Sequence, residues 1–466
     1  MDKEETTPEL LARQERAVVV APAGCGKTHI IAESIKYTEG RQLILTHTHA
    51  GVHSIRNKLI KLQIPSNKYR VETIAGFALR YASSYPKICG YDLFNDDQIV
   101  IYDNLYSAAE NVIRTIFGRK IINSTYSGLF VDEYQDCTID QHKLILTLSE
   151  ILPTRILGDP LQGIFEFTKN QVNWNKDIFQ FYIQLPDLTT PWRWKNNNSD
   201  LGAWLFDIRH NIESNENIYL SKLPSNTKWF INEWRNQINQ LFYSKGDTVG
   251  IIDIDNRAHK IASCLKGNYN SMEEMERRTL FKFINKFEKS SRKEKILEIF
   301  SIASKCITKI KNELKPIRIC LERDKRYNGK NETLKSFYFL IDNYLRTGNN
   351  ILILELIRLV SSFENSNIYR KELWMDIEKI FSSSVLNPEE SLKNIARKYL
   401  ETYSIIGRKV YRKTISRPHL IKGLEFNHAI LLDADALKPK ELYVSLTRGS
   451  NYLTILSKQR VLTPKN

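Results

Sequence analysis

Residues 21–28 combine the residue types and the spacing that a loop needs in order to bind phosphate groups. They read Ala-Pro-Ala-Gly-Cys-Gly-Lys-Thr and follow the apolar run 17–20, so we expect a buried strand, then the loop, then a helix. The glycines would let backbone N–H groups turn inward around phosphates, the lysine would reach the β and γ oxygens, and the threonine would ligate Mg²⁺. The first position is alanine where the motif G-x-x-x-x-G-K-[ST] has glycine, so the loop is a variant. The segment predicts a site for ATP or another nucleoside triphosphate with Mg²⁺, and its contacts would be Ala23, Gly24, Cys25, Gly26, Lys27, Thr28 and His29.

Two adjacent carboxylates close a second predicted strand. Residues 129–136 read Leu-Phe-Val-Asp-Glu-Tyr-Gln-Asp. Asp132 would bind Mg²⁺, directly or through water, and Glu133 would be the general base for the water that attacks the γ-phosphate. Acidic residues after a strand can also merely solvate a loop, but the phosphate loop upstream favours the chemical role. A metal-dependent nuclease built on these carboxylates and Asp136 is the competing chemistry, and the sequence shows no second acidic cluster with a catalytic lysine to support it.

Seven segments carry the motifs of one family of motor proteins, in that family's order. They are Thr46-His-Thr-His-Ala-Gly-Val52, Thr73-Ile-Ala-Gly-Phe77, Asp132-Glu-Tyr-Gln-Asp136, Gly158-Asp-Pro-Leu-Gln-Gly-Ile-Phe165, Pro191-Trp-Arg193, His419-Leu-Ile-Lys-Gly-Leu-Glu-Phe426 and Tyr443-Val-Ser-Leu-Thr-Arg448. Together they resemble the UvrD/Rep-like family of superfamily one helicases over residues 14–456. The resemblance implies an α/β fold of the P-loop NTPase class, with two RecA-like, doubly wound parallel-sheet lobes, helical insertions and ATP hydrolysis in the cleft between the lobes. It also implies movement along single-stranded DNA from 3′ to 5′.

The same resemblance implies roles for the residues that would act on the γ-phosphate and the base. Gln162 would sense the γ-phosphate, while Arg193 and Arg448 would act as arginine fingers on the phosphoryl transition state. Trp192 stands where the family has a tyrosine, and its flat ring would stack on the adenine.

The resemblance implies three further nucleotide contacts. Glu425 would contact the ribose, and Gly423 would let the backbone approach the phosphates. Gln14 stands near the place of the family's adenine-reading glutamine. Only 13 positions separate it from Lys27, fewer than the family has, so the alternative of a surface-helix glutamine stays open.

The segments that the family uses to hold single-stranded DNA depart from its pattern. His47 replaces the base-stacking aromatic and His49 replaces an asparagine, and both can stack or hydrogen-bond only more weakly. Phe165 and Phe167 replace a tyrosine and a tryptophan, and Thr168 replaces the arginine that follows. These departures favour ATP hydrolysis over vigorous unwinding as the predicted activity. The candidate DNA contacts are Thr46, His47, His49, Thr73, Phe165, Phe167 and His419.

The charge of the chain favours a polyanionic partner. The 68 Lys and Arg residues outnumber the 53 Asp and Glu residues, which gives a formal net charge of +15. Residues 256–330 alone hold 20 Lys/Arg against 9 Asp/Glu in a segment of helical patterning. Such a run can be a plain solvated helix face, or it can bind nucleic acid or a partner protein.

Motif spacing predicts the organisation of the 466 residues. Residues 1–185 would form the first lobe, with a short helical insertion at about 80–125. The second lobe would comprise residues 186–261 and 406–466, and a helical, basic insertion over 262–405 would separate its two parts.

The end of the chain suggests how such a motor would act. Only 18 residues follow Arg448, which leaves room for one strand and a tail but not for a nuclease domain. A small UvrD-like chain with a short first insertion and altered DNA-stacking residues is similar to the helicase-like subunit of Gabija-type anti-phage systems, whose partner is an ATPase-Toprim nuclease. A nuclease partner is therefore implied. A non-motor alternative stays open, in which the chain binds ATP or a DNA end and signals to a partner without processive unwinding.

Composition predicts the compartment. The N-terminus is charged, and no apolar run reaches the ~18 residues that a membrane helix needs. The six cysteines have neither C-x-x-C pairs nor zinc-ligand spacing. We therefore expect a cytoplasmic protein without membrane helix, disulfide framework or zinc site.

Overall fold

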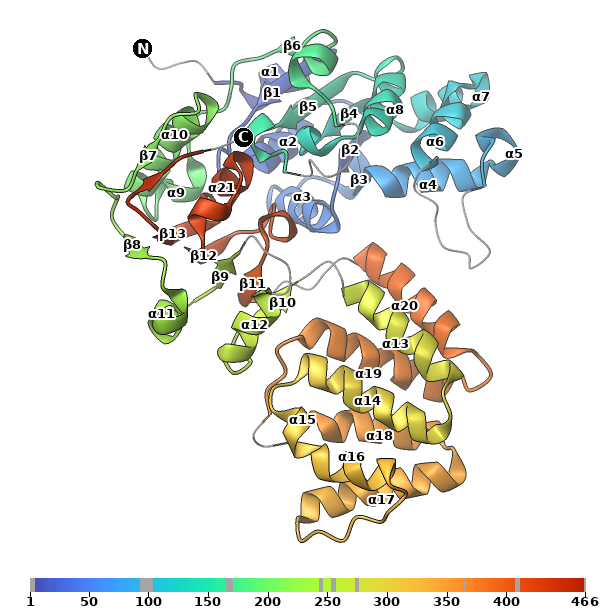
Figure 1. Ribbon diagram of the computed structural model, residues 1–466. Coiled ribbons are helices and arrows are strands. Elements are labelled where there is room, and N and C mark those ends of the chain that lie inside the picture. The colour runs from blue at the N-terminus through green and yellow to red at the C-terminus, as the bar shows by residue number, and fades with distance from the viewer. Residues whose placement is uncertain are drawn as a thin grey trace. The chain divides into compact units, whose positions relative to one another are not determined.

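The computed structural model describes residues 5–92, 104–164, 171–242, 246–252, 257–272, 276–363, 366–406 and 411–464 (Figure 1). The chain divides into two compact units. The first unit comprises Met1–Ile231, Lys422–Asn427 and Ala434–Asn466, and the second comprises Asn232–Ile421 and His428–Asp433. The lobe boundaries inferred from motif spacing differ from these units and stay a prediction.

A six-stranded parallel sheet forms the centre of the first unit, with the order β3-β2-β4-β5-β1-β6. Its strands are β1 (Arg16–Val20), β2 (Gln42–Thr46), β3 (Tyr69–Thr73), β4 (Gly128–Val131), β5 (Thr154–Gly158) and β6 (Ile183–Gln184). Strand β1 coincides with the apolar run expected before the phosphate loop, and β2 and β5 precede the first DNA motif and the G-D-x-x-Q segment. The carboxyl ends of parallel strands lie at one edge of the sheet, so the motifs that follow them are gathered there.

Both faces of this sheet are covered by helices, because successive residues of each strand point to opposite sides. Val18, Leu43 and Ile156 belong to an apolar core with α4 (Ile74–Ser84), α6 (Leu105–Arg114), α7 (Ile116–Thr125) and α8 (Ile139–Ser149). Val19 and Ile44 belong to a second core with α1 (Pro8–Ala12), α2 (Lys27–Ser34) and α3 (His49–Lys61).

The helical segment expected near residues 80–125 consists mainly of helices in the part that the structure describes. It contains the end of α4, then α5 (Pro86–Cys89), α6 and α7. Residues 93–103, within this segment, lie outside the described residues.

The first unit also contains elements from later in the chain. Strands β8 (Thr227–Ile231) and β13 (Gly449–Ser457) pair in parallel, and β7 (Ile218–Tyr219) and β14 (Val461–Leu462) pair antiparallel. Its remaining helices are α9 (Trp192–Lys195), α10 (Ser199–Glu213) and α21 (Pro439–Leu446).

The second unit contains another set of parallel strands, in the order β10-β11-β9-β12. They are β9 (Thr248–Ile251), β10 (Asn270–Met272), β11 (Lys413–Ser416) and β12 (Phe426–Leu431), of which His428–Leu431 pair with β9. Two short helices, α11 (Trp234–Leu241) and α12 (Arg257–Cys264), precede the long helical part.

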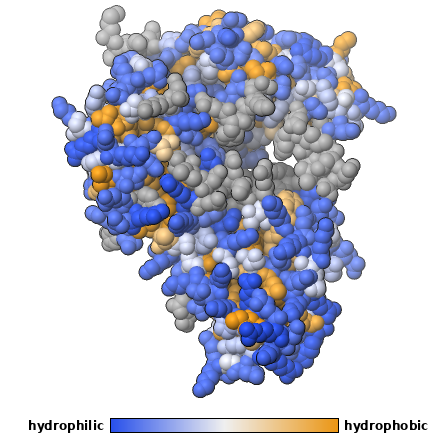
Figure 2. Space-filling view, in the orientation of Figure 1, coloured by the Kyte–Doolittle hydropathy of each residue, from blue (hydrophilic) through white to orange (hydrophobic). Residues whose placement is uncertain are grey.

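Within the described residues, the eight helices between β10 and β11 share one apolar core, which includes the fully buried Phe337 and Trp374. The apolar stretch 350–360 forms one of them. The surface over these helices is mainly hydrophilic (Figure 2). The helices are α13 (Glu276–Lys289), α14 (Arg292–Cys306), α15 (Ile310–Glu313), α16 (Lys315–Glu322), α17 (Glu332–Thr347), α18 (Asn350–Val360), α19 (Lys371–Leu386) and α20 (Leu392–Ile406).

The predicted fold class is confirmed. Parallel strands flanked by helices occur in both units, and a helical segment is inserted into the second. Within the described ranges, none of the helices has the length and hydropathy required of a membrane-spanning segment. The six cysteines form no disulfide.

Candidate nucleotide-binding and catalytic site

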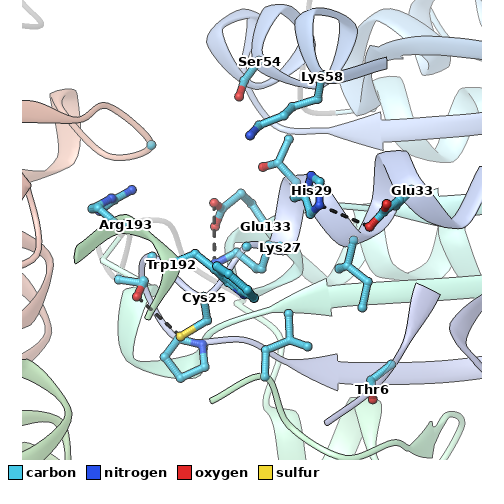
Figure 3. A pocket seen from close by; sticks show the side chains of 18 of the residues that line it. Thr6, Cys25, Lys27, His29, Glu33, Ser54, Lys58, Glu133, Trp192 and Arg193 are labelled. Atoms are coloured by element: carbon cyan, nitrogen blue, oxygen red, sulfur yellow. Dashed lines mark hydrogen bonds and ion pairs between the residues drawn. The ribbon is translucent and has the colours of Figure 1, made fainter. Parts of the chain in front are cut away.

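A cavity of about 900 Å³ lies over the phosphate loop, and all the residues that line it belong to the first unit (Figure 3). Nearly all of the predicted nucleotide-binding and catalytic residues line this cavity. The structure brings together the loop residues Ala23 to His29, Glu133, Gln162, Trp192, Arg193, Gly423, Glu425 and Arg448.

The phosphate loop has the backbone conformation that its glycines were expected to allow. Gly24 has φ +75° and Gly26 has φ +87°, a region that residues with a Cβ rarely adopt. Gly26 immediately precedes α2, so the loop leads directly into a helix N-terminus, where N–H groups attract anions. A Cβ on Gly24 would lie 2.5 Å from a ring carbon of Trp194, so the loop also packs closely on α9.

The phosphate-loop lysine lines the cavity, and neighbouring groups fix its side chain. Lys27 is buried, its Nζ donates to Ala21 O at 3.1 Å and lies 3.8 Å from Glu133 Oε1. Figure 3 shows Lys27 and Glu133 pointing toward one another. A cation and a carboxylate thus meet beside the loop that would hold the phosphates.

The two predicted Mg²⁺ ligands lie next to each other. Thr28 Oγ1 is 3.4 Å from Asp132 Oδ2, and a hydroxyl and a carboxylate are ligands that Mg²⁺ accepts, usually with waters and phosphate oxygens. Burial raises the pKa of the Asp132 carboxyl, and the neighbouring charge of Glu133 adds to this effect. A divalent cation would offset both, so the pair fits a Mg²⁺ site.

Glu133 has the environment of an ionised general base. Burial works against its charge, but Lys27 and then Lys422 more than offset burial and lower its pKa below the usual range. Glu133 has φ +56°, and its carboxylate accepts a hydrogen bond from Gln135 Nε2, so both its backbone and its side chain are fixed.

Gln162 and the two predicted arginine fingers meet on another side of the cavity. Arg448 is fully buried, and its Nη2 donates to Gln162 Oε1 at 3.4 Å. Burial, and next the charge of Arg193, lower the pKa of Arg448 to about 9. Arg193 donates to Glu425 Oε2 at 2.8 Å and to Thr447 O at 2.7 Å. Together with Lys27 these arginines suit a strongly anionic ligand such as a triphosphate.

An exposed aromatic ring borders the phosphate loop. Trp192 is 56% exposed, and one of its ring carbons lies 3.3 Å from the position of a Cβ on Gly26. His29 also lines the cavity and pairs with Glu33 at 3.2 Å. Lys195 Nζ lies over the indole, 4.3 Å from the ring centroid, so a flat base would stack on the exposed ring beside or in place of this ammonium group.

The N-terminal segment supplies cavity residues that the sequence did not indicate. Gln14 does not line the cavity, and its Nε2 donates to Leu10 O at 3.1 Å. Residues 5–8 line it instead, and the Glu5 carboxylate accepts hydrogen bonds from Thr189 and Thr190, just before Trp192. The adenine contact of Gln14 stays a prediction.

A buried ion pair beside the site was also missed. Lys422 Nζ donates to Asp136 Oδ2 at 2.6 Å and to Gln162 O, and both charged side chains are nearly inaccessible. Burial raises the pKa of Asp136 to about 6, although the Lys422 charge opposes this. Lys422 and Asp136 both lie inside motifs, but the motifs do not indicate that the two side chains pair with each other.

The candidate DNA contacts are partly assembled. Thr46 and Thr73 are opposite each other at the ends of β2 and β3, and His49 begins α3 nearby in sequence. His47 Nε2 is 3.4 Å from Cys137 Sγ, and burial lowers the pKa of His47 to about 3, so its ring is neutral near pH 7. His419 is buried in the second unit. Phe165 and Phe167 lie outside the described residues.

Acidic and thiol side chains do not gather elsewhere into an obvious metal centre. Within the part of the chain that the structure describes, no group of three or more His, Cys, Asp and Glu residues could hold a metal ion.

A known family model matches the first part of the chain. Residues 5–168 match the family model described as an AAA domain, a span that contains the phosphate loop, both adjacent carboxylates and Gln162. A search of curated protein sequences gave no match.

Three solved structures are similar at low sequence identity. The arterivirus nonstructural protein 10 helicase with DNA shares 14% identity over 53% of this chain and 50% of its own, with a TM-score of 0.28. The Pif1 helicase from Bacteroides, with ADP-AlF3 and single-stranded DNA, shares 12% over 55% of each chain, with a TM-score of 0.31. The Pif1 helicase from Candida albicans shares 10% over 99% of this chain and 95% of its own, with a TM-score of 0.43. The chain thus spans about half the length of the first two structures.

Proposed function

We propose that the protein is an ATP-dependent DNA translocase or helicase of UvrD-like type. The observation that carries this proposal is the cavity in which the phosphate loop, the ionised Glu133 and the cations Lys27, Arg193 and Arg448 converge. One carboxylate among several cations is what hydrolysis of a triphosphate requires, because the base must take a proton while the phosphoryl charge is stabilised.

The residues have separate tasks in the proposed hydrolysis. The loop N–H groups and Lys27 hold the β- and γ-phosphates, and Glu133 accepts a proton from the water whose oxygen bonds to the γ-phosphorus. The bond from that phosphorus to the β–γ bridging oxygen breaks, which releases ADP and phosphate. Arg193 and Arg448 stabilise the charge that develops on the transferred group. Thr28 and Asp132 would hold Mg²⁺, which would supply positive charge near the β- and γ-phosphates.

The finer features of the proposal rest on the motif resemblance. We propose stimulation by single-stranded DNA, movement from 3′ to 5′, and action with an ATPase-Toprim type nuclease in anti-phage defence. The net positive charge and the four candidate contacts at the ends of β2 and β3 support a nucleic-acid partner.

The test is ATP turnover with and without single-stranded DNA. Lys27→Ala should lose nucleotide binding or turnover. Glu133→Gln should bind ATP but turn it over at least ~100-fold more slowly, since a general base contributes at least that much. Glu150→Gln, an exposed carboxylate paired with Arg119, is the matched control and should be normal. Wild-type turnover in Glu133→Gln would refute the assignment, and DNA degradation without ATP would favour the nuclease chemistry.

A second candidate function is an ATP- or DNA-end-sensing subunit that signals to a nuclease without processive unwinding. It is favoured by His47, whose ring is held against Cys137 and so is less available for stacking on a base. Strand displacement from a duplex with a 3′ single-stranded tail separates the two candidates. DNA-stimulated hydrolysis without displacement or translocation would support the sensor.

A further inference from the structure

A second buried ion pair lies behind the cavity and joins α10 to the segment that carries Gln162. Arg209 Nη1 donates to Asp159 Oδ1 at 2.7 Å, and Asp159 has no exposed surface. The Arg209 side chain is 11% exposed and its Nη2 pairs with Glu213 at 3.0 Å. Neither Arg209 nor Asp159 lines the cavity.

Asp159 connects this pair to two catalytic side chains. Its second oxygen, Oδ2, accepts from Gln162 Nε2 at 2.7 Å, so the same carboxylate holds both Arg209 and Gln162. Its backbone N–H donates to Gln135 Oε1 at 2.9 Å, and Gln135 Nε2 donates to Glu133. The orientation of both Gln162 and the general base therefore depends on where Asp159 lies.

Arg209 also reaches the phosphate loop through one tyrosine. Its Nη1 donates to the Tyr443 hydroxyl at 3.2 Å, and that oxygen accepts from Ala23 N at 3.3 Å. The guanidinium lies over the Tyr443 ring, 5.5 Å from its centroid. The Arg209 guanidinium thus contacts both Tyr443, which accepts a hydrogen bond from the phosphate loop, and Asp159, which accepts one from Gln162. These two partners lie far apart in the sequence.

We propose that Arg209 is a positioning residue for ATP hydrolysis, which fixes Gln162 through Asp159 and the phosphate loop through Tyr443. This inference rests on the proposed function. It concerns turnover more than binding, because among the described residues the hydrogen bonds and ion pairs of Arg209 go to Asp159, Tyr443 and Glu213 and not to Lys27, Thr28 or Trp192. Removing the guanidinium leaves the buried Asp159 charge without this partner, and Asp159 then draws its remaining donors, Gln162 among them, out of place.

Arg209→Met keeps the length of the side chain but removes its charge and donors. We expect about 10²-fold slower turnover, since displacing a catalytic group by about 1 Å costs about that much. The ATP dissociation constant should change by less than about 3-fold, as the loop lysine and the indole are retained. Glu213→Gln is the matched control, because it removes only the partner of Nη2 on the same helix. It should behave as wild type.

Asp159→Asn combined with Arg209→Met separates positioning from a purely structural role. Asparagine keeps an oxygen that can accept from Gln162, and it carries no charge that would need the missing guanidinium. The double variant should therefore turn over ATP at least about 10-fold faster than Arg209→Met alone. Arg209→Lys restores charge but not the forked donor geometry, and should fall between wild type and Arg209→Met. These two variants carry the test if Arg209→Met does not fold.

The outcomes are distinct. Slow turnover with retained ATP affinity, together with recovery in the double variant, supports the inference. Normal turnover of Arg209→Met overturns it, and so does normal turnover of both Arg209→Lys and the double variant. Equal loss of ATP binding and turnover, without recovery in the double variant, also overturns it. Absence of ATP hydrolysis in the wild type would instead refute the proposed function itself.

Discussion

Arg193 donates to the carboxylate of Glu425 at 2.8 Å, so an arginine expected to act on the γ-phosphate is held by a residue expected to contact the ribose. Arg193 also donates to Thr447 O, the residue before Arg448. The two predicted arginine fingers are therefore linked through the backbone of one segment. Nucleotide binding that recruits Glu425 to a ribose hydroxyl would release Arg193 toward the phosphates.

This relationship predicts that each arginine matters for turnover and little for affinity. Arg193→Ala and Arg448→Ala should each lower the rate of hydrolysis by about 10³-fold, the effect of removing such fingers elsewhere. Steady-state turnover and equilibrium ATP binding measure the two quantities. Arg114→Ala, an exposed arginine paired with Glu110, is the control. Normal hydrolysis in both variants would show that the arginines do not act on the phosphoryl group.

The close contact of the phosphate loop with α9 gives a second prediction. Gly24→Ala would place a Cβ 2.5 Å from Trp194 in addition to straining a positive φ, so nucleotide affinity should be lost together with stability. Gly90→Ala has nearly the same φ, +76°, but its Cβ would be 3.6 Å from Asn111, so it should cost only the strain of about 1 kcal/mol. Denaturant unfolding and ATP binding are the measurements. Equal behaviour of the two variants would contradict the packing argument.

The geometry of Thr28 and Asp132 predicts how the protein depends on Mg²⁺. Asp132→Asn should raise the free Mg²⁺ needed for half-maximal turnover by at least about 10-fold, because a neutral oxygen is a weaker ligand than a carboxylate. Asp140→Asn, an exposed carboxylate paired with Lys143, should leave the Mg²⁺ dependence unchanged. An unaltered Mg²⁺ titration in Asp132→Asn would exclude it from the metal site.

The exposed indole of Trp192 predicts the strength of base binding. Trp192→Ala should weaken ADP binding by about 1–3 kcal/mol, the range for stacking one base on an aromatic ring, and Trp192→Phe should recover part of it. Tryptophan fluorescence should also change when ADP binds to the wild type. If Trp192→Ala binds ADP with wild-type affinity, the base lies elsewhere, for instance against residues 5–8.

Sequence was sufficient for the parts of the site that depend on local spacing. The turn of the phosphate loop needs glycines at fixed positions, and Asp132 and Glu133 are adjacent, so their placement follows from short motifs. The ion pairs of Arg209 and Lys422 could not be found this way. Arg209 pairs with a residue 50 positions away and Lys422 with one 286 positions away, and no local pattern marks either partnership.

The environment of His47 was equally beyond sequence reasoning. Its position in the first DNA motif predicted a ring that stacks on bases only weakly, but its packing depends on Cys137, which follows the carboxylate motif 90 positions later. The run of apolar residues in β1, by contrast, predicted a buried strand correctly, because burial on both faces needs only a continuous apolar run.

Helix α13, at the start of the basic helical segment, has one apolar side and one basic side. Its apolar residues Leu280, Phe283, Ile284 and Phe287 are buried in the core of the second unit, whereas Lys282, Lys286 and Lys289 are exposed on the opposite side.

Charge reversal of Lys282 and Lys289 tests whether this face binds nucleic acid. If each lysine binds one phosphate, each reversal should weaken DNA binding alike for all sequences and flatten the slope of log affinity against log salt by about one unit. Lys335→Glu, on α17 and paired with Glu332, is the control. Weaker binding with a flatter slope would identify a DNA surface, and retained DNA binding with loss of a nuclease partner would identify a docking surface. No change in either would mean that the lysines only solvate α13, since the buried side of the helix is sufficient to explain its amphipathic pattern.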